Sequence, residues 1–157
     1  NMRKEKLMNK ALCVTSFIAM VALAGCAGLG GPSPEEEAMA QCQAMVDDIM
    51  AGQVDESTLA YISEDFSHPD VPDKQALADY LEMGQDMGYL DDVPALIEEH
   101  DAEIYLGDAE AVLQDDGAVS IYPIDASAIE GAVTVELLWQ QDEDGVWRVV
   151  GATVEGI

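Results

Sequence analysis

The chain has 157 residues, 49% of them hydrophobic, and 32 acidic residues against 6 basic ones give it a formal net charge of −26. A body this negative repels nucleic acid and anionic lipid surfaces, and it disfavours acidic substrates. The length suits one domain with a core and not two, and the hydrophobic content argues against a disordered chain.

The beginning of the chain has the order of an export signal. A basic start is followed by an apolar run over 11–24 and by small residues before Cys26. That run is shorter than the roughly 20 residues of a membrane-spanning helix. The tetrad 23–26, Leu-Ala-Gly-Cys, resembles the lipobox of bacterial lipoproteins, which implies cleavage before Cys26 and acylation of that residue. A signal cut elsewhere, with an incidental cysteine, is the alternative.

From this resemblance we expect three parts: a signal peptide over 1–25, a lipidated and flexible tether over 26–34, and a domain over 35–157. The acyl chains would anchor the exported protein to a bacterial membrane, facing the periplasm or the exterior. The lipid on Cys26 is therefore the predicted link to the membrane.

Removal of the signal would leave 31 acidic residues against Lys74 and Arg148, a net charge of about −29. One interpretation is a solvated surface suited to high salt, where screening makes self-repulsion tolerable; it predicts a loss of stability in dilute buffer. The other is capture of divalent cations, but the acidic doublets and triplets do not match a calcium-binding loop. We favour the salt-adapted surface and expect both basic residues to form structural ion pairs.

The first part of the predicted domain has a helical pattern. Ser33, Pro34 and Glu36 have the spacing of a capping box with proline in the first turn. Hydrophobic residues then recur every three or four positions. Asp73 can cap a later helix that ends at Gly88. The predicted helices cover about 34–50, 56–62 and 73–88.

From about residue 100, hydrophobic residues alternate with polar ones, which indicates strands. Turns rich in Asp and Gly separate them, and Pro123 restricts its strand to an edge or a bulge. Five stretches have this pattern: 104–106, 111–113, 119–121, 133–139 and 146–150. Helices followed by strands indicate an α+β fold, with three N-terminal helices packed on an antiparallel sheet of four to five strands.

Two sets of residues extend this interpretation. The stretch 144–151 has the order acid-Gly-x-Trp-basic followed by hydrophobic residues, typical of a closing hairpin. Asp65-Phe66, Asp73-Lys74 and Gly88-Tyr89-Leu90 are similar to a segment that links the second and third helices in small secreted domains. Both sets resemble the nuclear transport factor two-like, or SnoaL-like, superfamily, over roughly residues 35–155.

The resemblance implies a cone-shaped α+β barrel, in which a curved sheet wraps around the helices and leaves a cavity. Known members include isomerases, dehydratases, cyclases, accessory subunits and binding domains without activity. The two sets of residues report a fold and not a chemistry, because unrelated functions share such a fold.

His68 is the strongest candidate for catalysis, because it lies near Asp70 in a proline-containing loop. A carboxylate beside a histidine fixes its tautomer and stabilises the imidazolium, which makes a workable general base. The competing interpretation, a surface loop residue, is the one we favour, and His100 is expected to be exposed. Cys42 is expected in the core, and these residues have no zinc spacing. We therefore expect no metal and no cofactor.

Aromatic residues are the candidates for lining a small apolar pocket, although filling of the core is the competing use. Trp139 shares its predicted strand face with Val133, Val135 and Leu137, so we expect it to face the helices. The candidates are Tyr61, Phe66, Tyr80, Tyr122 and Trp139.

The sequence thus favours an acidic, membrane-anchored lipoprotein whose domain binds a small ligand or a partner protein without catalysis. One alternative is a small-molecule isomerase or dehydratase that uses His68 with a carboxylate such as Asp70. Another is an assembly or inhibitor subunit that forms a homodimer through the outer face of the sheet. No nucleic acid partner is expected.

Overall fold

The computed structural model describes residues 31–156, and Pro32–Ile157 forms a compact unit with a core of its own residues. The predicted signal peptide and Cys26 lie outside the described residues. Among the helices of 31–156, none has the length and apolar character needed to cross a membrane.

Helix α2 (Pro34–Met50) begins as its sequence predicts. The Ser33 hydroxyl accepts a hydrogen bond from the Glu36 backbone N–H, and the Glu36 carboxylate accepts one from the Ser33 N–H at 2.9 Å. These two bonds satisfy N–H groups that have no partner within the helix. The helix buries one stripe of small and medium side chains against the sheet: Ala38, Cys42, Met45 and Val46.

Three shorter helices follow: η1 (Glu56–Tyr61), α3 (Lys74–Asp86) and α4 (Val93–Glu99). The second predicted helix is present as the 3-10 helix η1, and Asp73 caps α3 as predicted. Helix α4 was not predicted. It spans 7 residues with a proline in its first turn, too short for a hydrophobic period to be recognised.

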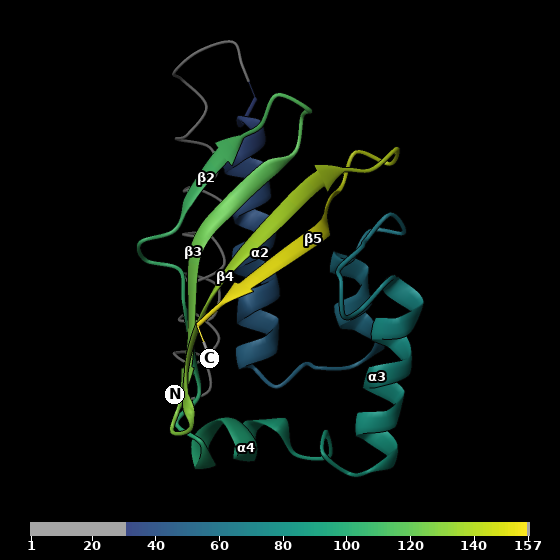
Figure 1. The fold of residues 1–157 in the computed structure, drawn as a ribbon, viewed down its shortest axis with the longest axis vertical. Coiled ribbons are helices and arrows are strands. Elements are labelled where there is room, and N and C mark those ends of the chain that lie inside the picture. The colour runs from purple at the N-terminus through teal and green to yellow at the C-terminus, as the bar shows by residue number, and fades with distance from the viewer. Residues whose placement is uncertain (1–30, 157) are drawn as a thin grey trace, which may run out of the picture. The chain divides into compact units, whose positions relative to one another are not determined.

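The five strands are β1 (Glu103–Tyr105), β2 (Glu110–Leu113), β3 (Val119–Ala128), β4 (Gly131–Gln141) and β5 (Trp147–Glu155). They form one antiparallel sheet in the order β1-β3-β4-β5, and β2 pairs with β3 along the same side as β1 (Figure 1). Bulges interrupt the register between Ile121 and Ile124, beside Pro123, and between Leu138 and Trp139. Bulges bend strands and increase their twist, so they help to curve the sheet.

The inner face of this sheet is covered unequally. Where β3 begins and β4 ends, Val119, Ile121 and Trp139 are fully buried, together with Val149 of β5. Helix α2 crosses this part of the sheet, whereas α3 stands beside the sheet and α4 lies below it (Figure 1). The predicted α+β architecture, with helices on a curved antiparallel sheet, is confirmed.

Candidate functional site

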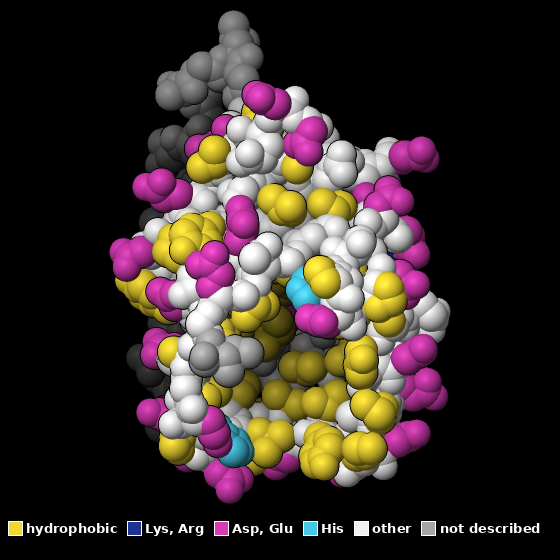
Figure 2. All heavy atoms as spheres, viewed as in Figure 1, with side chains coloured by type: hydrophobic (Ala, Val, Ile, Leu, Met, Phe, Trp, Pro, Cys, Tyr) yellow, Lys and Arg dark blue, Asp and Glu magenta, His cyan; other side chains and the backbone are white. Residues whose placement is uncertain are grey.

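The sheet, α3 and α4 border one region of the face drawn in Figure 1. Figure 2 shows that this region is hollowed, with hydrophobic side chains gathered on its floor and along its lower side. We call this concavity the hollow. Concave surfaces lined with apolar side chains are the usual form of a small-molecule site.

Part of the inner face of the sheet is not covered by α2 (Figure 1). Register places Ala126 of β3 opposite Val133 of β4, and Val135 opposite both Ile124 and Val154. Residues that pair directly in an antiparallel sheet point to the same face, so these side chains share the face of the buried core. They are half-buried or exposed, whereas Val119 and Trp139 at the other end are fully buried. We call these residues the open inner half: Ala126, Val133, Val135 and Val154.

The helices beside the hollow also carry apolar side chains in contact with solvent. Leu77 of α3 packs against the core, but other large hydrophobic residues of α3, α4 and their connection are exposed. Such a concentration of exposed hydrophobic residues is uncommon outside binding surfaces. These residues are Tyr80, Met83, Met87, Tyr89 and Leu96.

Helix α4 is held at both ends. At its start Pro94 contacts Gly52, which has a φ of +85° just after α2, so closely that a Cβ there would lie 2.6 Å from the proline ring. At its end the Ile129 backbone N–H donates to the His100 carbonyl at 2.8 Å, and His100 Nδ1 lies 2.5 Å from the Glu130 carboxylate. The pKa of Glu130 is lowered, first by its own backbone N–H and then by His100.

The predicted aromatic candidates do not gather in one place. Phe66 and Trp139 belong to the buried core, and Tyr61 packs against it. Tyr80 is 54% exposed on α3, and Tyr122 is 44% exposed. Because Tyr122 pairs with Glu110 and alternates with the buried Ile121, its side chain lies on the outer face of the sheet.

Two of these aromatics carry polar atoms at the core. The Tyr61 hydroxyl donates to the Asp48 carboxylate at 2.6 Å, and this bond, with burial, raises the pKa of Tyr61 to about 12. Trp139, which was predicted to face the helices, is fully buried, and its indole N–H has no hydrogen-bond partner among the described residues. A buried donor without a partner costs stability.

The two histidines are not paired for catalysis. His68 Nδ1 accepts a hydrogen bond from the backbone N–H of Asp70 at 3.1 Å, which places the proton of the neutral ring on Nε2. The contact is with the backbone of Asp70 and not with its carboxylate. His100 was expected to be exposed; it is half-buried, with 43% of its side chain exposed, and pairs with Glu130.

The remaining reactive candidate, Cys42, is completely buried in the core as predicted. Burial raises the pKa of its thiol to about 11, which keeps it protonated and unreactive. Within residues 31–156, no group of three His, Cys, Asp or Glu side chains is arranged to hold a metal ion.

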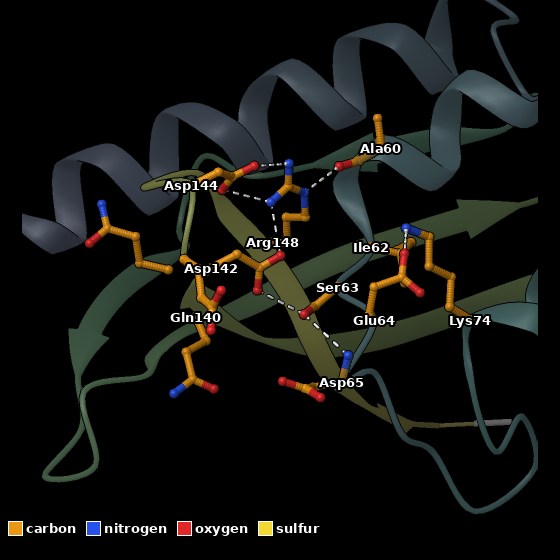
Figure 3. Close-up of a pocket in the computed structure, with 12 residues that line it drawn as sticks. Ala60, Ile62, Ser63, Glu64, Asp65, Lys74, Gln140, Asp142, Asp144 and Arg148 are labelled. Atoms are coloured by element: carbon orange, nitrogen blue, oxygen red, sulfur yellow. Dashed lines mark hydrogen bonds and ion pairs between the residues drawn. The ribbon is translucent and has the colours of Figure 1, made fainter.

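A second concavity, a polar pocket of about 700 Å³, lies at the β4–β5 turn (Figure 3). Arg148 is at its centre. Its guanidinium bonds the carboxylates of Asp142 and Asp144, each at 2.8 Å, and the Ala60 carbonyl at 3.1 Å. The buried Ser63 hydroxyl donates to the other oxygen of Asp142 at 2.9 Å. This network fastens the turn to the segment after η1.

Both basic charges in this pocket are paired within it. Hydrogen bonds from Arg148, and then from the Val146 backbone, lower the pKa of Asp144 to about 2, and the same ion pairs raise the pKa of Arg148. Lys74 is paired with Glu64 at 2.7 Å. Both basic residues therefore form ion pairs, as predicted. The pocket itself was not predicted, although the acidic triplet before Arg148 was its sequence signal.

No protein-family model matches the sequence, and no curated protein matches it either. Solved structures do match. Aln2 from a Streptomyces species aligns with a TM-score of 0.53 and 16% identity, over 80% of this chain and 93% of its own. A protein assigned as a calcium/calmodulin dependent protein kinase II association domain, from Xanthomonas campestris, aligns with a TM-score of 0.51 and 12% identity, over 83% of this chain and 93% of its own.

These likenesses cover nearly the whole described unit and most of each matched chain, at identities that establish a fold and not a function. They agree with the element order, the curved five-stranded sheet and the helices on its inner face. The chain therefore has the nuclear transport factor two-like, or SnoaL-like, α+β cone fold.

Proposed function

We propose that this domain binds a small, mainly apolar molecule in the hollow and carries out no chemistry on it. The observation that carries the proposal is the open inner half of the sheet, where apolar side chains on the same face as the core stay in contact with solvent. Covering this surface with an apolar ligand gains roughly 25 cal/mol for each Å² removed from water.

The arrangement of the histidines favours binding over isomerase or dehydratase chemistry. A general base needs a partner that orients it and raises its basicity, and His68 has only a backbone N–H on its Nδ1. His100, at the end of α4, is paired with Glu130 of the β3–β4 turn. Cys42 is a buried thiol.

The proposal also includes the predicted place of the protein in the cell. The tetrad ending at Cys26 supports export and lipid attachment, and the residues between Cys26 and α2 are few enough to hold the domain near its membrane. A Cys26→Ala variant expressed in bacteria tests this part. It should lose the mass of the acyl chains and leave the membrane fraction; an unchanged mass would contradict the proposal.

Binding is tested with Nile red, an uncharged apolar dye whose fluorescence rises in apolar surroundings. The unit Pro32–Ile157 is titrated with the dye, beside two variants that place a bulky side chain on opposite faces of β3. Ala126→Trp fills the hollow, whereas Ser127→Trp points to the outer face.

We expect saturable binding by the parent and by Ser127→Trp, and at least a roughly tenfold weaker affinity for Ala126→Trp. Near-ultraviolet circular dichroism confirms that both variants are folded. No saturable binding by the parent, or equal loss in both variants, would overturn the proposal.

A further inference from the structure

Two common kinds of anion-binding group, basic side chains and helix N-termini, are both occupied in the described domain. The first kind is the basic side chain. Lys74 and Arg148 are the basic residues of 31–156, and each is held by carboxylates at 2.7 to 2.8 Å in the polar pocket. Their side chains are only 23% and 20% exposed. Neither is free to meet a carboxylate or phosphate of a ligand in the hollow.

The second kind is the N-terminus of a helix, where free backbone N–H groups and the helix dipole attract anions. Each described helix has a side chain of its own at this place, and three of the four are carboxylates. The contacts are Ser33 with the Glu36 N–H, Asp55 with Ser57, Asp73 with Ala76 and Asp92 with Ala95. An approaching anion would therefore meet negative charge at η1, α3 and α4.

The two histidines do not add an unpaired positive charge for an anion. His100 is already paired with the Glu130 carboxylate, and His68 uses Nδ1 to accept a backbone N–H. A carboxylate that entered the hollow would lose water, and Lys74, Arg148 and His100 would offer it no unpaired positive charge in compensation. An ammonium group at the entrance would instead be attracted by the acidic surface.

We infer that the hollow selects apolar molecules that are uncharged or cationic, and rejects apolar anions such as ionised fatty acids. This inference rests on the proposed function, because it assigns a chemical class to the ligand of the same hollow. The proposed function concerns whether the hollow binds an apolar molecule, whereas this inference concerns the charge of that molecule.

Three probes with the same ten-carbon chain test the selectivity: 1-decanol, decyltrimethylammonium and decanoate. Each displaces Nile red from the unit Pro32–Ile157 at pH 8, where a carboxylic acid is ionised, and below its micelle concentration. We expect decanoate to bind at least about tenfold more weakly than decanol in dilute buffer, and decyltrimethylammonium to bind at least as tightly as decanol. In molar salt the difference in affinity between decanoate and decyltrimethylammonium should become smaller, because salt screens exposed charges.

A matched pair of variants separates local recognition from net charge. Val154→Arg adds a cation on the inner face, and Thr153→Arg adds the same charge on the neighbouring outer-face position. Only Val154→Arg should bring decanoate to within about threefold of decanol. Failure of all three probes would refute the proposed function itself. Decanol binding with equally tight decanoate binding, or an equal gain in both variants, would overturn the selectivity alone.

Discussion

The two halves of the inner sheet face have similar side chains and different surroundings. At the packed half, Val119, Ile121 and Trp139 lie beneath α2 and are completely buried. At the open half, Val133 and Val135 continue the same face of β4, yet they remain half-buried. Hydrophobic alternation along a strand therefore says which face is apolar, but not whether protein or a ligand covers it. The packed half stabilises the fold, and the open half is the surface for which we propose binding.

The largest expected effect comes from removing the centre of the packed half. Trp139→Ala should lower the free energy of unfolding by about 3–5 kcal/mol, because it leaves a large cavity among fully buried neighbours. Chemical denaturation measures the change. Trp139→Phe is the control: it keeps an aromatic ring and removes the indole N–H that has no partner, so it should cost much less. Equal losses in both variants would contradict this account of the packed half.

A substitution at the contact between the end of α2 and the start of α4 tests how α4 is held beside the hollow. Gly52→Ala should destabilise the domain by about 1–2 kcal/mol, because a φ of +85° is unfavourable for alanine. Its Cβ would also press on the Pro94 ring and displace α4. Nile red affinity should fall together with stability. Gly117→Ala, also at positive φ but with open space around its Cβ, should destabilise without affecting the dye.

The ion pairs at the β4–β5 turn support the packed half, and their contribution depends on pH. Arg148→Met should lower stability at neutral pH. In the folded protein the pKa of Asp144 is lowered from its ordinary value of 3.8 to about 2. The ion pair therefore stabilises the fold fully above pH 3.8, and this stabilisation is lost as the pH falls toward 2. The difference between parent and variant should therefore shrink between about pH 4 and pH 2, as followed by thermal melting. Lys74→Met is the control, because the Glu64 side chain is 85% exposed and such pairs contribute little.

The smallest expected effect on stability belongs to the open half. Val154 is 50% exposed, so Val154→Ala should change the free energy of unfolding by no more than about 0.5 kcal/mol. The same variant should weaken Nile red binding about threefold, because it removes apolar surface from the proposed site. A large loss of stability without a change in dye affinity would show that Val154 belongs to the core, and the comparison of the two halves would fail.

Local patterns predicted the elements well where one short-range interaction decides them. The capping box of α2 needs only Ser33 and Glu36, and the cap of α3 needs only the Asp73 carboxylate before the first turn. Helix α4 escaped prediction because contacts distant in sequence, with Gly52 and with the β3–β4 turn, hold its seven residues. The predicted proximity of His68 and Asp70 is present in the chain, but the backbone conformation directs the N–H of Asp70 to the ring. The roles proposed for the aromatic residues and for Cys26 stay predictions.

The sequence by itself determined the α+β order, the inner face of the long strand β4 that carries Trp139, the burial of Cys42, and the pairing of the two basic residues. These features follow from periodicity, capping and charge, which act between near neighbours or over the whole composition. Only the tertiary structure decided that α2 covers one half of the sheet while α3 and α4 leave the other half hollow. That outcome depends on where separate elements come to rest, and side chains with the same pattern serve as core at one end of a strand and as a proposed binding surface at the other.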